Sequence, residues 1–201
     1  MAARGRPREF DRDQALETAM RVFLRHGYDG TSVSFLGEKM GINTPSLYAA
    51  FSSKDALYQE AVGLYVTRLS TPLLAALSAS PSARQGIQQF LETCARYFHA
   101  QPEGERGCMI FNGDLVYAPA FHQRAKEMTT RRKTAEQAIL ARLERSLQDG
   151  EIPASAKPTQ LAAYFCVVLQ GLSIRARDGN DLDDLLQVIT QAMSVWPQQV
   201  H

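Results

Sequence analysis

The chain has 201 residues, 45% of them hydrophobic, and a formal net charge of +1. This size allows a sizeable core, in one domain or in a small domain joined to a larger one. No run of eighteen apolar residues and no apolar segment behind the polar start is present, so we expect a cytoplasmic protein without a membrane span.

Positive charge is concentrated at the start of the chain. Residues 1–8 carry Arg4, Arg6 and Arg8 and no acid. We expect residues 1–9 to form a flexible basic arm, because positive and negative charges nearly balance over the chain as a whole.

Helical periodicity runs along the chain and no segment shows convincing strand alternation, which predicts an all-α fold. Asp11 and Gln14 form a capping box that opens a first helix, which ends near Gly27. Thr31–Ser32 is expected to cap a short second helix, and Gly41 is well placed as its left-handed stop.

A third helix follows at once and is very short. Thr44 is its predicted cap and Pro45 its predicted first residue, and the helix ends at Phe51 after two turns. Ser52 and Asp55 resemble the capping pair of a fourth helix.

The two-turn helix has distinct inward and outward faces. Leu47, Ala50 and Phe51 satisfy the helical spacing of an inward face. The outward positions are small, hydroxyl-bearing or aromatic: Pro45, Ser46, Tyr48 and Ala49. A short exposed helix after a glycine turn is typical of a helix-turn-helix whose second helix enters a DNA major groove, although an ordinary αα-corner has the same pattern.

The stretch "FLRHGYDGTSVSFLGEKMGINTPSLYAAFSSKDALYQEA", Phe23 to Ala61, resembles the N-terminal DNA-binding domain of TetR-family transcriptional repressors. The match is dense over about the first sixty residues and strongly favours the helix-turn-helix over the αα-corner. It implies a three-helix DNA-binding domain over 10–56 and a helical effector-binding and dimerisation domain over 57–201.

The resemblance also implies roles for single residues. Tyr48 and Lys54 would bond DNA phosphates, and Thr44, Pro45, Ser46 and Ala49 would lie against base edges. Ala50 departs from the family, which often has histidine there, so one phosphate contact is absent. The predicted DNA-binding residues are Arg4, Arg6, Arg8, Ser34, Thr44, Pro45, Ser46, Tyr48, Ala49 and Lys54.

The basic arm contains "RGRPR", Arg4 to Arg8, which resembles the core of an AT-hook. Because an extended Arg-Pro segment suits a narrow minor groove, we favour minor-groove contact over a merely solubilising tail.

Beyond residue 60 the fourth helix is expected to continue to a break at 77–83. Further helices are predicted from there to His99, from Cys108 to 118, and over 121–148, 158–177 and 181–196. The last two helices are apolar on more than one side, with Ala163, Val167, Gly171 and Ile174 as a second stripe.

One core does not readily cover both apolar faces, so we expect a homodimer, although burial within one subunit is the alternative. The predicted interface residues are Leu161, Phe165, Val168, Leu172, Leu186, Ile189 and Met193.

Cys108 follows Arg106-Gly107 at the predicted start of a helix, where both features would favour a thiolate. The "GC" pair also resembles TetR-family members that respond to electrophiles or oxidants. The alternative is that Cys108 is a small side chain packed near a pocket, without a reactive role. Cys94 and Cys166 are expected to be inert packing. The predicted effector-pocket residues are Cys108, Phe111, Asn112, Leu115, Phe121 and Gln170.

The sequence predicts a dimeric repressor that binds a pseudo-palindromic DNA operator and is released by a small-molecule or thiol-reactive inducer. It contains no Gly-rich phosphate loop, HExxH or GxSxG motif, and no metal or cofactor is predicted. The alternatives are a regulator that activates or answers to a protein partner, and a helical enzyme using Cys108 with the distant His99 or His122 as base.

Overall fold

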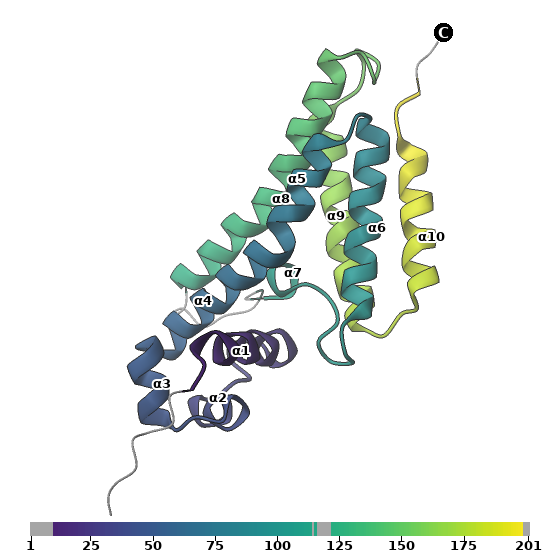
Figure 1. The fold of residues 1–201 in the computed structure, drawn as a ribbon. Helices are drawn as coiled ribbons and strands as arrows, with labels where there is room; N and C mark the ends of the chain where they lie inside the picture. Colours follow the sequence, from purple (N-terminus) through teal and green to yellow (C-terminus); the bar gives the residue numbers. More distant parts are fainter. Residues whose placement is uncertain (1–9, 114, 116–121, 199–201) are drawn as a thin grey trace, which may run out of the picture. The chain divides into compact units, whose positions relative to one another are not determined.

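The computed structural model describes residues 10–113, 115 and 122–198, and every regular element within these ranges is helical (Figure 1). The prediction of an all-α fold is confirmed. The chain divides into two compact units, Met1–Leu64 and Tyr65–His201. The division lies later than the expected boundary at residue 56, because Leu57, Tyr58 and Ala61 are still buried side chains of the segment that closes the first unit.

The first unit contains α1 (Arg12–His26), α2 (Val33–Met40), α3 (Thr44–Phe51) and most of α4 (Lys54–Tyr65). The Asp11 carboxylate caps α1 by accepting from the backbone N–H groups of Asp13 and Gln14. The Ser32 hydroxyl caps α2, and Gly41 ends that helix in the left-handed conformation with φ of 67°. These predictions are confirmed.

Two predicted caps are wrong by one residue. The cap of α3 is Asn43, whose Oδ1 accepts from the N–H of Ser46 at 2.8 Å, because Thr44 is already helical. The cap of α4 is Ser53, whose hydroxyl accepts from the N–H of Ala56 at 3.0 Å. Ser52 instead ends α3 with a φ of 63°, a backbone conformation that residues other than glycine rarely adopt.

Aromatic and leucine side chains form the core of the first unit. The ring of Tyr58 on α4 lies edge-on to Phe23 and Tyr28, with centroid separations of 5.0 and 5.1 Å. Leu36 from α2 and Leu47 from α3 are completely buried. All four helices therefore contribute to one core, which fixes the face that α3 presents outward.

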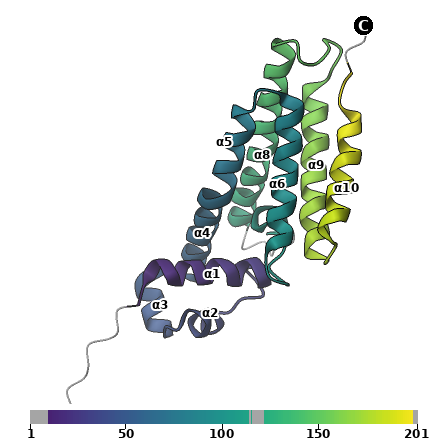
Figure 2. The same ribbon diagram turned by 45° about the vertical axis from the view of Figure 1, so that its right-hand side comes forward.

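The second unit is a bundle of longer helices (Figures 1 and 2). After a π-helical turn at Val66–Ser70, it contains α5 (Thr71–Ala79), α6 (Ala83–Ala100), α7 (Met109–Asn112), α8 (His122–Gln148), α9 (Pro158–Arg177) and α10 (Leu182–Ala192), with a 3₁₀ turn at Met193–Val195. Helix α9 packs against α6, α8 and α10, and α5 packs against α6 and α8.

Helix α7 is shorter than predicted. A helix was expected from Cys108 to residue 118, but α7 ends at Asn112, where the N–H of Gly113 donates to the carbonyl of Met109. The remainder of that prediction lies largely outside the described residues.

One helical stretch in the described part of the chain, Lys54–Ala79, is long and apolar enough to cross a membrane by length and composition. The core helix of a soluble protein passes the same test, so this property alone is weak evidence for a membrane span.

Candidate nucleic-acid interface and ligand cavity

Helix α3 presents the predicted DNA-reading residues on its open side. Thr44, Pro45 and Ala49 are exposed, Ser46 is half-buried, and 45% of the Tyr48 surface is accessible. The opposite side is anchored in the core by Leu47 and Phe51. The geometry thus brings small and hydroxyl-bearing groups together on one accessible helix face, as a base-reading helix requires.

Arg12 holds the other end of α3, and sequence reasoning missed it. Its guanidinium donates to the carbonyl of Ala50 at 3.3 Å and to both carboxylate oxygens of Glu60 at 2.8 and 2.7 Å. It also lies 4.5 Å from the centre of the Phe51 ring. Because Asn43 caps the first turn, the two-turn helix is secured at both ends.

We expect Arg12→Ala to loosen α3. Loss of these contacts should cost about 1–2 kcal/mol and so speed amide exchange in the segment 44–52 by about 5- to 30-fold. We expect both effects near the lower end of these ranges, because the ion pair with Glu60 is partly solvated. Hydrogen–deuterium exchange with mass spectrometry measures this. The control is Arg21→Ala, which removes only a 3.3 Å pair with Glu17 along α1. Equal exchange rates in the two variants would contradict the proposal that Arg12 holds the end of α3.

Lys54 lies next to the start of α2. Its ammonium sits 3.9 Å from the centre of the Tyr28 ring, and Lys54, Thr31 and Ser32 border one polar hollow in the first unit. The hydroxyl of Ser34 is 3.0 Å from that of Ser32. A positive charge beside a helix N-terminus suits a phosphate. Arg4, Arg6 and Arg8 of the predicted arm lie outside the described residues.

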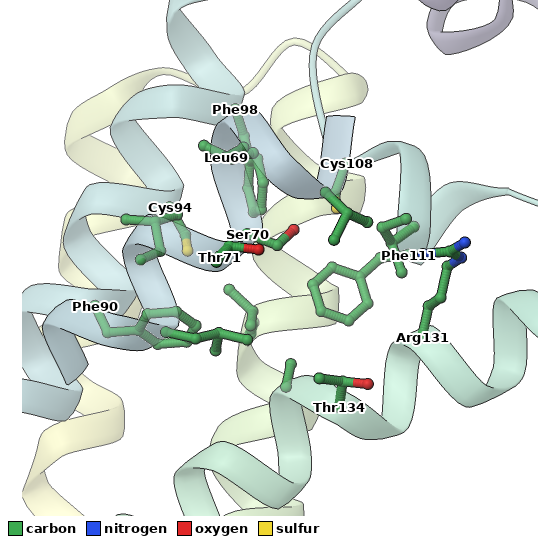
Figure 3. A pocket seen from close by; sticks show the side chains of 16 residues that line it. Leu69, Ser70, Thr71, Phe90, Cys94, Phe98, Cys108, Phe111, Arg131 and Thr134 are labelled. Atoms are coloured by element: carbon green, nitrogen blue, oxygen red, sulfur yellow. The ribbon is translucent and has the colours of Figure 1, made fainter. Parts of the chain in front are cut away.

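The second unit contains a mainly apolar cavity of about 150 Å³ (Figure 3). Its walls come from the π-helical turn, α5, α6, α8, α9 and the segment around α7. The rings of Phe90, Phe98 and Phe111 line it, and the polar groups on its wall include the hydroxyls of Ser70 and Thr134. Apolar cavities of this size in other proteins bind molecules as small as benzene.

Two predicted effector residues, Cys108 and Phe111, line this cavity. Cys94, which was expected to be inert packing, also lines it. Phe90 and Phe98 were missed because α6 carries many apolar positions, and only packing against its neighbours decides which of them border a cavity.

Three other predicted effector residues are not among the described residues that line this cavity. The Asn112 side-chain oxygen accepts from the Ser173 hydroxyl at 3.0 Å, which joins α7 to α9. Leu115 is 57% exposed, and Gln170 instead donates to the sulfur of Cys166. Phe121 lies outside the described residues.

Of the two interpretations that the sequence left open for Cys108, a reactive thiolate and a packed side chain, the structure favours the packed side chain. The residue is buried, and burial raises the pKa of its thiol, outweighing the nearby Tyr65 hydroxyl and the N–H groups of α7, which act in the opposite direction. Burial likewise raises the pKa of the Cys94 thiol. The structure therefore supports the packing interpretation, in which both thiols are neutral parts of the cavity wall.

We expect native Cys108 to react with iodoacetamide at pH 7 at least ~10-fold more slowly than in the urea-unfolded chain, because access and thiolate population are both reduced. The raised pKa also makes the free energy of unfolding depend on pH. The stabilisation is fully present below the ordinary thiol pKa, and it is lost as pH rises above that value, because ionising the thiol costs more in the folded chain. Mass-spectrometric labelling at several pH values measures the effect. Native labelling as fast as in the unfolded chain would contradict it.

Helix α9 has one buried and one open apolar face. Four predicted interface residues belong to the chain's own core, so their assignment to an interface is wrong: Phe165, Leu172, Ile189 and Met193. Leu161, Val168 and Leu186 are half-buried. The second stripe is open, with Val167 at 64% and Ile174 at 48% exposure, so burial of both faces within one chain is also wrong.

Comparisons with known proteins agree with this architecture. A family model described as bacterial regulatory proteins, tetR family, matches residues 15–61. The chain is 32% identical to the HTH-type transcriptional repressor ComR of Escherichia coli (strain K12), over 98% of this chain and 94% of ComR. It is 30% identical to the repressor BdcR of the same strain, over 94% of this chain and 90% of BdcR.

Solved structures of TetR-family regulators are also similar to this chain. A cysteine variant of the TetR-family transcriptional regulator CifR, complexed with 26-base-pair double-strand operator DNA, is 36% identical, with a TM-score of 0.90 over 96% of this chain and 100% of the CifR chain. Sequence similarity to ComR and BdcR also extends over nearly the whole chain, beyond the DNA-binding unit. The chain therefore belongs to the TetR family of bacterial transcriptional regulators.

Proposed function

We propose that the chain is a transcriptional repressor that binds operator DNA as a homodimer and leaves it when a small molecule occupies the cavity of the second unit. The observation that carries this proposal is the short α3 helix, which is capped by Asn43, clamped by Arg12 and open on the side of Ser46. The naming of ComR and BdcR as repressors and the operator complex of CifR support it.

Two kinds of DNA contact are assigned to the first unit. Thr44, Pro45, Ser46 and Ala49 read base edges in the major groove, where small side chains contact thymine methyls or single hydrogen-bonding positions. Tyr48 and Lys54 bind phosphates and set the register of α3. The arginines of the arm contact the adjacent minor groove.

The open face of α9 supplies the dimer contact. Val167 and Ile174 are large exposed apolar side chains, and Gly171 between them allows a second helix to approach closely. In a twofold dimer this face meets its own copy, and two α3 helices then enter grooves about one helical turn apart. The operator is correspondingly pseudo-palindromic.

The cavity is the inducer site of this proposal. A molecule that favours the dimer with the wrong separation of its α3 helices needs a coupling of only about 1–3 kcal/mol to lower operator affinity severalfold to a hundredfold. The buried, neutral Cys108 thiol favours reversible occupancy over attack by a thiol-reactive inducer. The repressor works in the cytoplasm, where its DNA is.

DNA binding is tested with duplexes that the protein selects from a random library. Lys54→Ala should weaken binding to all sequences alike and reduce the salt slope by about 1, because a phosphate contact releases a counterion. Ser46→Ala should change preference at one or two base pairs by about 1–3 kcal/mol. Fluorescence anisotropy over a salt series measures both effects.

The charge-matched control is Lys133→Ala, an exposed position on α8 of the second unit. If both α3-region variants bind as the control does, the DNA-binding role of this surface is wrong.

A further inference from the structure

Among the described residues that line the cavity, Arg131 on α8 is the only charged one, and none is acidic. Figure 3 shows Arg131 rising from α8 along one side of the cavity, near Phe111. The remaining wall is dominated by aromatic and aliphatic groups, with a few hydroxyls and thiols. The cavity therefore has one cationic side and an apolar interior.

The Arg131 guanidinium forms no ion pair or hydrogen bond with another residue in the described part of the chain. Its neighbour Arg132 differs, because it donates to the carbonyls of Ile110 at 3.2 Å and Gly113 at 3.0 Å and so holds the α7 segment against α8. Arg132 thus has a structural role, whereas the Arg131 guanidinium lies at the edge of the cavity and has no partner among the described residues.

Thr134 lies one helical turn after Arg131 and lines the same cavity. Within the described part of the chain, its hydroxyl makes one hydrogen bond, a long one of 3.3 Å to the carbonyl of Thr130 in its own helix. Arg131 and Thr134 are three residues apart and therefore lie on the same face of α8. The guanidinium can offer a pair of N–H donors to a small anion, and the hydroxyl can offer one more hydrogen bond.

We propose that the inducer is a small monocarboxylate with an apolar body, whose carboxylate pairs with Arg131 and whose body lies among Phe90, Phe98 and Phe111. This inference rests on the proposed function of the cavity as inducer site. A carboxylate accepts two hydrogen bonds from a guanidinium, and no existing ion pair has to be broken first. The volume of about 150 Å³ limits the body to roughly the size of a benzene ring.

Three probes share one ring and differ in charge: benzoate, benzamide and benzylamine. Benzoate should bind about 10- to 100-fold more tightly than benzamide, because a charge-assisted hydrogen-bond pair replaces neutral contacts, and benzylamine should bind most weakly. Isothermal titration calorimetry of the full-length protein gives the affinities, and fluorescence anisotropy follows release of operator DNA. Hexanoate extends the test to a carboxylate with a flexible body.

Arg131→Gln should abolish the advantage of benzoate over benzamide and leave benzamide binding within about 3-fold, since only the charge contact is lost. The matched control is Lys133→Gln, which removes the same charge from an exposed residue of α8 outside the cavity wall. Ala135→Leu narrows the cavity and should weaken all the probes together.

Equal affinities for benzoate and benzamide, or unchanged benzoate binding by Arg131→Gln, would overturn the carboxylate proposal and leave the cavity as inducer site. Failure of both benzoate and hexanoate to bind would overturn it as well. If the probes bind to the parent protein and Ala135→Leu weakens none of them, the ligand site lies elsewhere, and the assignment of the cavity in the proposed function is wrong.

Discussion

Val167→Arg is expected to leave each subunit folded but to prevent pairing, and operator affinity should then fall by about 10²- to 10⁴-fold, because the two half-sites are no longer bound together. Val167 is 64% exposed, so the arginine fits on an isolated subunit. In a twofold interface, however, each copy brings one new charge to the same apolar contact with Ile174. Burying these charges without partners is strongly unfavourable.

Two matched variants make this result specific. Gln137→Arg adds the same charge to an exposed position on α8 and should leave the dimer intact. Phe165→Ala truncates a fully buried neighbour on α9 and should lower the free energy of unfolding by about 3–5 kcal/mol. Light scattering after size exclusion gives the mass. If Val167→Arg stays dimeric with the operator affinity of the parent, the interface does not include this face.

The contrast between Val167 and Phe165 shows where sequence reasoning stops on α9. Periodicity correctly indicated two apolar stripes, but both are apolar, so the pattern carries no signal for which one faces the core. Only packing against α6, α8 and α10 decides this, and it buries Phe165 and exposes Val167. The predicted interface therefore contained several core residues.

The first unit was predicted more closely, because caps and glycine stops act within a few residues of the chain. Asp11, Ser32 and Gly41 lie where their local signals place them. The two capping errors were single-residue shifts between adjacent polar residues, Asn43 for Thr44 and Ser53 for Ser52. The Arg12 contacts join positions 38 and 48 residues apart, and no local pattern reports such a distance.

The ligand cavity was the least predictable feature. It depends on a cluster of helices meeting at one place, and the choice of Asn112 and Gln170 assumed that α7 and α9 turn these residues inward. The structure instead uses Asn112 to bind Ser173, and aromatic rings from α6 line the cavity. A helix register that differs by one residue rotates a side chain by about 100°, so small errors in phase change the lining completely.

Leu47→Ala is expected to abolish specific DNA binding while the second unit remains folded. Leu47 is completely buried, and α3 has only two turns, so this side chain and Phe51 supply most of its anchorage. A buried Leu→Ala change costs about 2–5 kcal/mol, which is most of the stability available to a unit of this small size. Helix α3 then loses the fixed position from which Ser46 and Tyr48 are expected to reach DNA.

The single tryptophan, Trp196, lies buried in the second unit and separates the two responses. Its fluorescence should report an unchanged unfolding midpoint in Leu47→Ala, whereas amide exchange in α1 to α3 should accelerate and the anisotropy signal of operator binding should disappear. The control is Leu115→Ala, the same truncation at a side chain that is 57% exposed, which should change unfolding by less than about 0.5 kcal/mol. Operator affinity equal to that of the parent in Leu47→Ala would mean that the position of α3 does not depend on its buried leucine.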